Sequence, residues 1–118
     1  MTSAFRADPE LLVLLFRNLA INAVTYNQRD PVEIEADARV DPDGSLEIRF
    51  RDNGVGLAPD ERERIFAEFY RGRHGAMARG SGLGLALCRR IAALHGGTIA
   101  VAESSREGTS FHLRSPGV

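Results

Sequence analysis

The sequence predicts an α+β fold with two layers, in which three main helices pack on one face of a mixed, mostly antiparallel sheet. Two observations predict this fold. Apolar residues recur at helical spacing in two long segments and one short one, and two pairs of segments have the pattern and the short turns of β-hairpins. The order helix, hairpin, helix, loop, helix, hairpin favours helices gathered on one side of the sheet.

Composition limits the class of protein. With 118 residues, of which 43% are hydrophobic and 26% charged, the chain is expected to form one domain over residues 1–118. The 15 basic and 16 acidic residues nearly cancel, which argues against a nucleic-acid-binding surface. The only cysteine, Cys88, allows no internal disulfide, and the longest apolar run, residues 11–16, is far shorter than the roughly 20 residues of a membrane-spanning helix. We therefore expect a cytoplasmic location.

The first helix is predicted from its start signal. Asp8 is a suitable N-cap and Pro9 suits the first helical position, and apolar residues then recur to about Asn27. The period changes to two in VEIEADARV (32–40), which predicts a half-buried strand whose apolar face is covered. A DPDG turn leads to a second alternating strand at 46–50, so the two strands form a hairpin.

The rest of the chain again has helical segments followed by a hairpin. A short helix is predicted around residues 59–66, and the Gly- and Arg-rich segment 70–80 has no period and is expected to be a loop. Residues 83–95 are helical again, and two consecutive glycines end this helix. A second hairpin follows, with strands at 98–104 and 108–114.

The turn DNGVG (52–56) is the first candidate for chemistry. The Asp52 carboxylate can accept a hydrogen bond from an exocyclic amine such as that of adenine, and Gly54 and Gly56 would let a flat ligand approach bare backbone. Asp, Asn and Gly are also common turn formers, so a plain strand-to-loop turn is an equal alternative for this segment alone.

The segment GSGLGLAL (80–87) is the second candidate. Gly80, Gly82 and Gly84 precede and enter a helix, whose free N–H groups and positive dipole end suit a phosphate. A flexible hinge into an ordinary helix is the alternative. Two familiar phosphate loops are excluded, because the chain has no lysine and because Leu85 stands where a GxGxxG pattern needs its last glycine.

Three arginines, Arg71, Arg73 and Arg79, lie just before that glycine run. For each of them a solvated position in a basic loop is the simpler interpretation. Guanidinium groups pair well with phosphate oxygens, so at least one contact with a phosphate is expected from their place beside the glycines.

A polar strip on the first helix is the third candidate. At 100° per residue, the side chains of Asn18, Asn22, Thr25 and Tyr26 fall within roughly one 100° sector. An amide oxygen is a suitable ligand for Mg²⁺, which takes few protein ligands beside substrate phosphates. The alternative is an amphipathic helix whose polar strip faces water.

These segments together resemble a known family. The run NLxxNA, DNGVG, IFAEFYR (65–71), GSGLGLAL, HGGTI (95–99) and GTSF (108–111), in this order, is similar to the catalytic and ATP-binding domain of bacterial sensor histidine kinases. That domain belongs to a superfamily shared with gyrase, the large heat-shock chaperones and mismatch-repair ATPases. The resemblance implies a two-layer α/β sandwich of the Bergerat type with a mobile ATP lid.

The resemblance also implies roles for individual residues. ATP and Mg²⁺ would be the cofactors, Asn22 the metal ligand, and Asn22 with Asn18 the catalytic pair. Asp52 would bind the adenine amino group with Thr109 nearby, residues 70–80 would form the lid, and Phe66 and Phe69 would anchor it. The implied nucleotide-binding residues are Asn18, Asn22, Thr25, Tyr26, Asp52, Gly54, Gly56, Arg71, Arg73, Arg79, Gly80, Gly82, Leu83, Gly84 and Thr109.

The identity of residue 18 separates branches of this superfamily. Branches that hydrolyse ATP carry a glutamate there, which activates water as a general base. Asn18 is an amide and cannot take a proton, so the resemblance implies transfer of the γ-phosphoryl to a protein histidine.

The chain also departs from the family. Thr25 stands where a lysine is usual, Glu68 replaces a proline, and no His-Glu or His-Asp phosphoacceptor pair occurs. The expected partners are therefore a helical-hairpin dimerisation domain that bears the histidine and, indirectly, a response regulator, with the isolated chain a monomer. A regulatory module that binds nucleotide without transferring phosphate, and an ATPase of the gyrase or chaperone type, are the alternatives.

Overall fold

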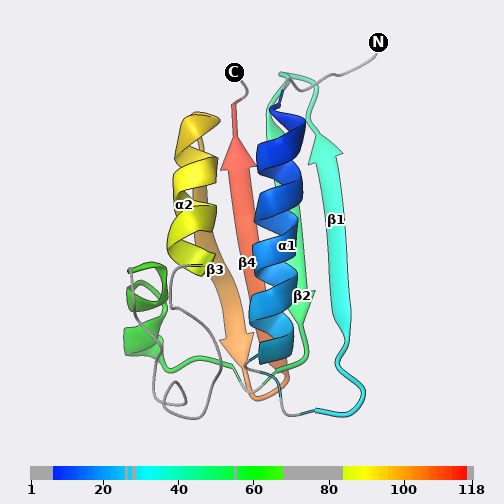
Figure 1. The fold of residues 1–118 in the computed structure, drawn as a ribbon, viewed down its shortest axis with the longest axis vertical. Helices are drawn as coiled ribbons and strands as arrows, with labels where there is room; N and C mark the ends of the chain where they lie inside the picture. The colour runs from blue at the N-terminus through cyan, green and yellow to red at the C-terminus, as the bar shows by residue number, and fades with distance from the viewer. Residues whose placement is uncertain (1–6, 26, 28, 55, 68–83, 117–118) are drawn as a thin grey trace.

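The computed structural model describes residues 7–25, 27, 29–54, 56–67 and 84–116. Its elements run in the order helix, hairpin, two short 3-10 turns, helix, hairpin (Figure 1). Their bounds are α1 Pro9–Thr25, β1 Ile34–Val40, β2 Leu46–Asp52, η1 Pro59–Glu61, η2 Arg64–Phe66, α2 Gly84–Leu94, β3 Thr98–Ser105 and β4 Gly108–Ser115.

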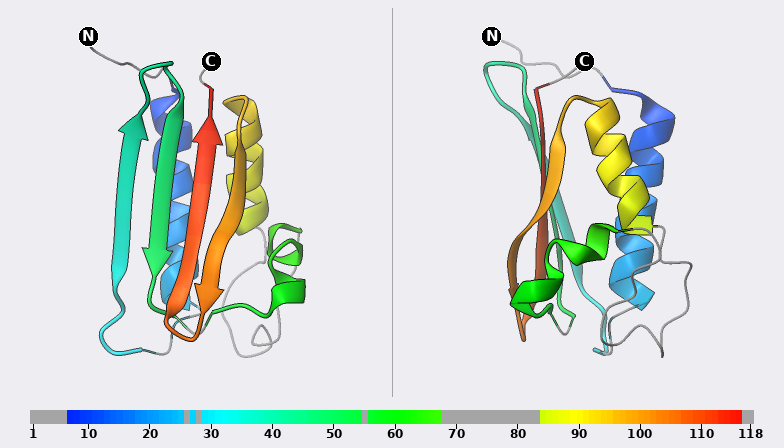
Figure 2. Two further views of the ribbon diagram at one scale, coloured as in Figure 1. Left: turned by 180° about the vertical axis from the view of Figure 1, so that it is seen from behind. Right: turned by 90° about the vertical axis from the view of Figure 1, so that its left-hand side faces the viewer.

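The four strands form one sheet in the order β1-β2-β4-β3, so the strands that end the two hairpins pair with each other at its centre. Both helices lie on the same face of this sheet (Figure 2). The predicted two-layer α+β class is confirmed. All three hydrogen-bonded pairs of described strands are antiparallel, and the short third helix takes the form of the 3-10 turns η1 and η2.

The core lies between the two helices and the central strands. Leu15 and Cys88, on facing helices, have no exposed surface, and burying a side chain the size of leucine stabilises a fold by about 1.5–3 kcal/mol. The remaining buried apolar residues are Leu19, Ala23, Leu46, Ile48, Phe50, Ile65, Phe66, Leu85, Ile91, Ala92, Ile99, Phe111 and Leu113.

The prediction of a half-buried first strand is wrong. Six of the seven residues of β1 are exposed, among them Ala36 and Ala38 on the face expected to be covered, and Ile34 keeps 38% of its surface. The reason is the sheet order, because β1 is an edge strand and the described helices lie over the other strands instead (Figure 1). Alternation indicates two unlike faces and does not show that anything packs on the apolar one.

The predicted helix ends are confirmed. The Asp8 carboxylate accepts the backbone N–H groups of Glu10 at 3.0 Å and Leu11 at 3.1 Å, as an N-cap does. At the C-terminus of α2, which lies at the same end of the helical layer, Gly96 has a φ of 72°, a left-handed conformation that favours glycine, and stops the helix. No helix in the described ranges is long and apolar enough to cross a lipid bilayer.

His95 joins the end of α2 to the start of α1. Its Nδ1–H donates to the carbonyl of Ile91 at 2.9 Å, so its Nε2 is the acceptor of the Asp8 N–H at 3.1 Å. The hydroxyl of Ser115 donates to the His95 carbonyl. The sequence predicted only a helix C-terminal residue here, whereas the side chain is 5% exposed and links three elements.

We predict that His95→Ala lowers the free energy of unfolding by about 2 kcal/mol, because it leaves the Asp8 N–H and the Ile91 carbonyl without this partner. Urea unfolding followed by circular dichroism measures the change. His112→Ala is the matched control. The Nε2 of His112 is buried without a hydrogen-bond partner within the described residues, so its loss should cost less than about 1 kcal/mol. Equal losses for the two variants would contradict the linking role of His95.

Candidate functional site

The predicted site residues that the structure describes gather at one end of the two layers. The end of α1, the end of β2, the start of α2 and the start of β4 all lie in the lower half of the molecule in Figure 1. The antiparallel order of the strands brings these ends together. Each of the ends carries one of the segments that the sequence singled out.

Asn18 faces the start of α2. Its Nδ2 donates to the carbonyl of Leu14 at 2.8 Å, which fixes the amide orientation because a carbonyl oxygen cannot donate. The other amide atom, Oδ1, therefore points toward Gly84, where an added Cβ would lie 3.1 Å from it. The helices α1 and α2 thus approach closely at Gly84, and Asn18 Oδ1 is a hydrogen-bond acceptor beside the N-terminus of α2.

Asn22 and Thr25 lie further along α1 and are half-buried. No side-chain hydrogen bond joins Asn22 to another residue of the described ranges, so its amide oxygen is available to a ligand. Amide oxygens and water are ligands that suit Mg²⁺, which needs few groups from the protein. The residue types at this end therefore fit such an ion.

Asp52 is a buried carboxylate with 7% of its surface exposed. It pairs in register with Thr109 on β4, and its Oδ1 accepts the Gly54 N–H at 2.8 Å. Burial raises the pKa of the Asp52 carboxyl, and the hydrogen bonds from the backbone of Gly54 and Thr109 oppose that rise only in part. An acceptor held in this way, at the last residue of a strand, can recognise an N–H donor of a ligand.

The protein's own packing accounts for the two glycines of the turn. A Cβ at Gly54 would lie 2.9 Å from Asp52 Oδ1, and one at Gly56, which has a φ of 80°, would lie 2.0 Å from the carbonyl oxygen of Ser105. The protein's own backbone and carboxylate fill the space on that side. The described contacts thus explain both glycines without a flat ligand lying against them.

Ser104 is a site residue that sequence reasoning missed. Its hydroxyl accepts the Leu57 N–H at 2.7 Å and shares a hydrogen bond of 2.9 Å with the hydroxyl of Thr109. It therefore connects the segment after the DNG turn to the residue opposite Asp52. The available signal was its position across the second hairpin from Thr109.

Phe66 leads toward the segment that was expected to be a lid. Its ring meets Phe111 edge to face, with centroids 6.2 Å apart, and the Arg89 guanidinium lies 4.3 Å from its centroid. Arg89 also pairs with Glu63 at 2.6 Å. Several predicted residues lie outside the described ranges: Tyr26, Glu68, Phe69, Arg71, Arg73, Arg79, Gly80, Gly82 and Leu83.

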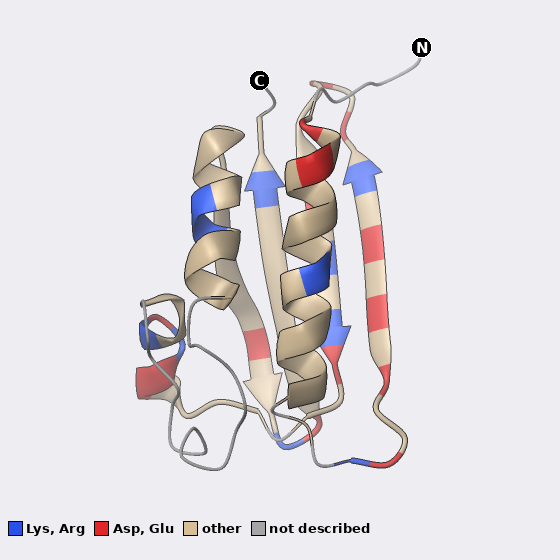
Figure 3. Cartoon of the chain, viewed as in Figure 1, with Lys and Arg blue, Asp and Glu red and all other residues tan. Residues whose placement is uncertain are grey.

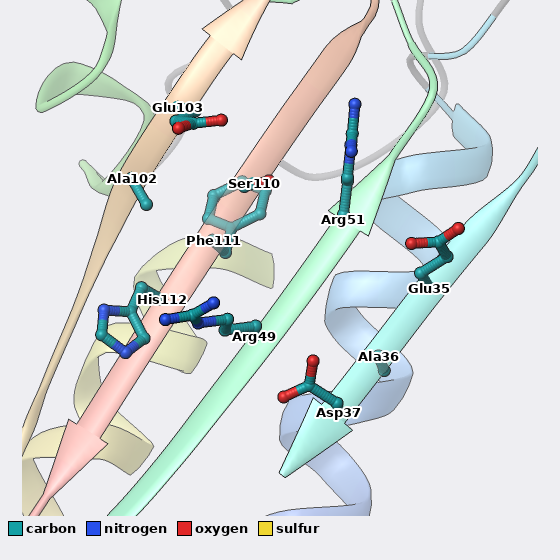
Figure 4. A pocket seen from close by; sticks show the side chains of 10 residues that line it. All are labelled: Glu35, Ala36, Asp37, Arg49, Arg51, Ala102, Glu103, Ser110, Phe111 and His112. Carbon is teal, nitrogen blue, oxygen red and sulfur yellow. The ribbon is translucent and has the colours of Figure 1, made fainter.

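A hollow of about 550 Å³ on the helix-free face of the sheet is separate from this end (Figure 4). In register across β1 and β2, Glu35 stands opposite Arg51 and Asp37 opposite Arg49, so charges of opposite sign adjoin. Figure 3 shows the same pattern, with acidic bands on β1 beside basic bands on β2. This face is a mixed-charge surface and does not select one sign of ligand.

Comparison with known proteins decides the family. The family model described as "Histidine kinase-, DNA gyrase B-, and HSP90-like ATPase" matches residues 7–117. The chain belongs to this ATPase family. The sensor-like histidine kinase SenX3 of Mycobacterium bovis is 38% identical over 111 residues, which cover 92% of this chain and 27% of that protein. The sensor protein QseC of Salmonella typhi is 42% identical over 108 residues, which cover 91% of this chain and 22% of that protein.

Solved structures of the ATPase family agree with the fold. Full-length ShkA, in complex with AMPPNP, matches with a TM-score of 0.81 and 30% identity, over 98% of this chain and 23% of that one. The chain thus spans about a quarter of the length of the curated relatives given above. The match covers the described helices and strands, including the end at which Asn18, Asn22 and Asp52 lie.

The raised pKa of Asp52 leads to a prediction about the ligand-free protein. A carboxyl whose pKa rises on folding stabilises the folded state at low pH, and this contribution is lost as the pH rises through the raised value. Asp52→Asn removes the titration. The free energy of unfolding of the wild type, relative to Asp52→Asn, should therefore fall as the pH rises above the ordinary carboxyl value of about 4.

Urea unfolding of both proteins at a series of pH values measures this difference. Asp37→Asn is the control, because Asp37 is an exposed carboxylate on the edge strand. A wild-type stability that rises with pH relative to Asp52→Asn would contradict the assignment of Asp52 as a carboxylate held in an unfavourable environment.

Proposed function

We propose that the chain is the ATP-binding catalytic domain of a two-component sensor histidine kinase. It would transfer the γ-phosphoryl of Mg-ATP to a histidine on a dimerisation domain that this sequence does not contain. The observation that carries the proposal is the arrangement of three side chains: the buried carboxylate acceptor Asp52, the Asn18 amide, which faces the start of α2, and the Asn22 amide, one helical turn further along α1.

Each part of ATP has a matching group. The Asp52 carboxylate would accept a hydrogen bond from the adenine amino group, with Thr109 beside it. Gly84 begins α2, where N–H groups without helical partners and the helix dipole favour phosphate oxygens. Asn22 would hold Mg²⁺, which, when bound, offsets the negative charge of the phosphates.

Asn18 supports transfer to a histidine in preference to hydrolysis. Its Nδ2 is already used by the Leu14 carbonyl, and its Oδ1 points toward α2. An amide oxygen at this place can orient a group but does not take a proton from water at neutral pH. An imidazole needs little help from a base, because its neutral form is already a nucleophile. The partners would be the histidine-bearing helical hairpin and, through it, a response regulator, in the cytoplasm.

Mixing the chain with a separately made helical-hairpin domain, γ-labelled ATP and Mg²⁺ tests the proposal. We take the hairpin of a matched relative, SenX3, as the acceptor. Label on the hairpin histidine is expected, and replacing that histidine with glutamine should abolish it. Nucleotide binding without label would favour the regulatory module, and label released as free phosphate without a hairpin would favour an ATPase.

Two substitutions test the assigned roles. Asn22→Ala should abolish Mg-dependent ATP binding, because the metal loses its protein ligand. Asp52→Asn should weaken adenosine binding by at least about tenfold, because an amide can present a donor where adenine also donates. Isothermal titration calorimetry measures both affinities. Unchanged ATP affinity in Asn22→Ala would refute the metal assignment, and unchanged adenosine affinity in Asp52→Asn would refute the assignment of the adenine acceptor.

A further inference from the structure

Two side-chain amides connect the segment after α1 to the turn after β2. The Nδ2 of Asn27 donates to the Oδ1 of Asn53 at 2.8 Å, although 26 positions separate the two residues in sequence. Neither residue belongs to a helix or strand, and the sequence assigned neither of them a role, although Asn53 lies within the DNGVG turn. We call this pair the amide bridge.

The backbone fixes the orientation of both amides. Asn53 Oδ1 also accepts the Glu33 N–H at 3.0 Å, and its Nδ2 donates to the Pro31 carbonyl at 3.1 Å. Asn27 Oδ1 accepts the Arg29 N–H at 2.8 Å. Turning either amide over would bring donor against donor or acceptor against acceptor, so the bridge has one arrangement.

The amide bridge lies directly against the adenine end of the candidate site. A Cβ at Gly54 would meet Asp52 Oδ1 at 2.9 Å on one side and the Cγ and Nδ2 of Asn27 at 3.6 Å on the other. The Asn27 amide and the Asp52 carboxylate therefore pack on the same glycine. Asn27 therefore lies directly beside the turn that carries Asp52, while the Gly54 N–H holds the carboxylate itself.

The bridge also fixes the end of α1. Asn27 follows α1 closely, and its backbone N–H donates to the Val24 carbonyl at 3.4 Å, so it continues the last turn of the helix. That helix carries Asn18 and Asn22 at the proposed phosphate and metal end, while Asn53 is the direct neighbour of Asp52. The amide bridge thus runs between the two halves of the site.

We propose that Asn27, through Asn53, is a positioning residue that sets the separation between the adenine end and the metal end. This inference rests on the proposed function. A ligand that engages both ends gains the full benefit of the second contact only when the protein already holds both ends at the right distance. Adenosine engages the Asp52 end alone, whereas Mg-ATP engages both ends. Loss of the bridge therefore weakens Mg-ATP binding more than adenosine binding.

The experiment compares the two ligands in the same variant. In Asn27→Ala, calorimetry should show the affinity for Mg-ATP reduced by about tenfold and the affinity for adenosine changed by less than about twofold. Asn27→Leu keeps the branching and the number of heavy atoms of the side chain but removes both hydrogen-bonding atoms, and it should give the same pattern. If the bridge acts as a unit, the double variant Asn27→Ala with Asn53→Ala should lower the ratio of the Mg-ATP affinity to the adenosine affinity by no more than Asn27→Ala alone does.

Ser45→Ala is the matched control. Ser45 donates to Asp43 at 2.6 Å in the turn between β1 and β2, at the opposite end of the sheet, and is 5% exposed. Its loss should lower stability without changing the ratio of the two affinities. Equal weakening of both ligands by Asn27→Ala would indicate a purely structural role and overturn the inference, as would unchanged binding of both. A wild-type protein that binds neither ligand would instead refute the proposed function itself.

Discussion

Burial of the Asp52 carboxylate is the constraint on which the rest of this end of the fold depends. A charged group with so little exposed surface is costly unless backbone donors surround it, and here Gly54 and Thr109 supply them. Thr109 reaches Asp52 only because β4 pairs with β2, and the approach of the two strands is so close that a Cβ at Gly108, which has a φ of 141°, would lie 1.8 Å from the Asp52 carbonyl oxygen. The pairing of β2 with β4 therefore both forms the centre of the sheet and holds the Asp52 acceptor in place.

The helical layer supplies the other polar side chains of the candidate site. In α1, leucines and an alanine pack on the sheet while Asn18 and Asn22 occupy a neighbouring sector, so one helix supplies both core and site. The close approach of α1 and α2 at Gly84 brings the Asn18 oxygen to the first turn of α2. The same packing that stabilises the fold thus sets which polar atoms face the candidate site, and small residues at the contact are what permit it.

Local signals in the sequence were enough for the elements and for part of the site. Asp8 with Pro9 gave the start of α1, the paired glycines after His95 gave the end of α2, and Asp52 was found because it follows an alternating strand and precedes a glycine turn. The exposure of β1 was not predictable, because alternation does not report what covers a strand. Ser104, Asn27 and Asn53 were missed because each acts through a partner that is distant in the sequence or lies in an irregular segment without periodicity.

The strand order has a consequence for how this end of the molecule forms. The first hairpin can close from local contacts, but the pairing of Asp52 with Thr109 joins the two hairpins across about half of the chain, and β4 is the last of the described elements. Contacts between distant segments carry a large loop-closure entropy and form late relative to local ones. The pairing of Asp52 with Thr109 is therefore absent from any species in which only the first hairpin and α1 are folded. A ligand of this end would stabilise the completely paired sheet alone, so its binding would report on whether the whole chain has folded.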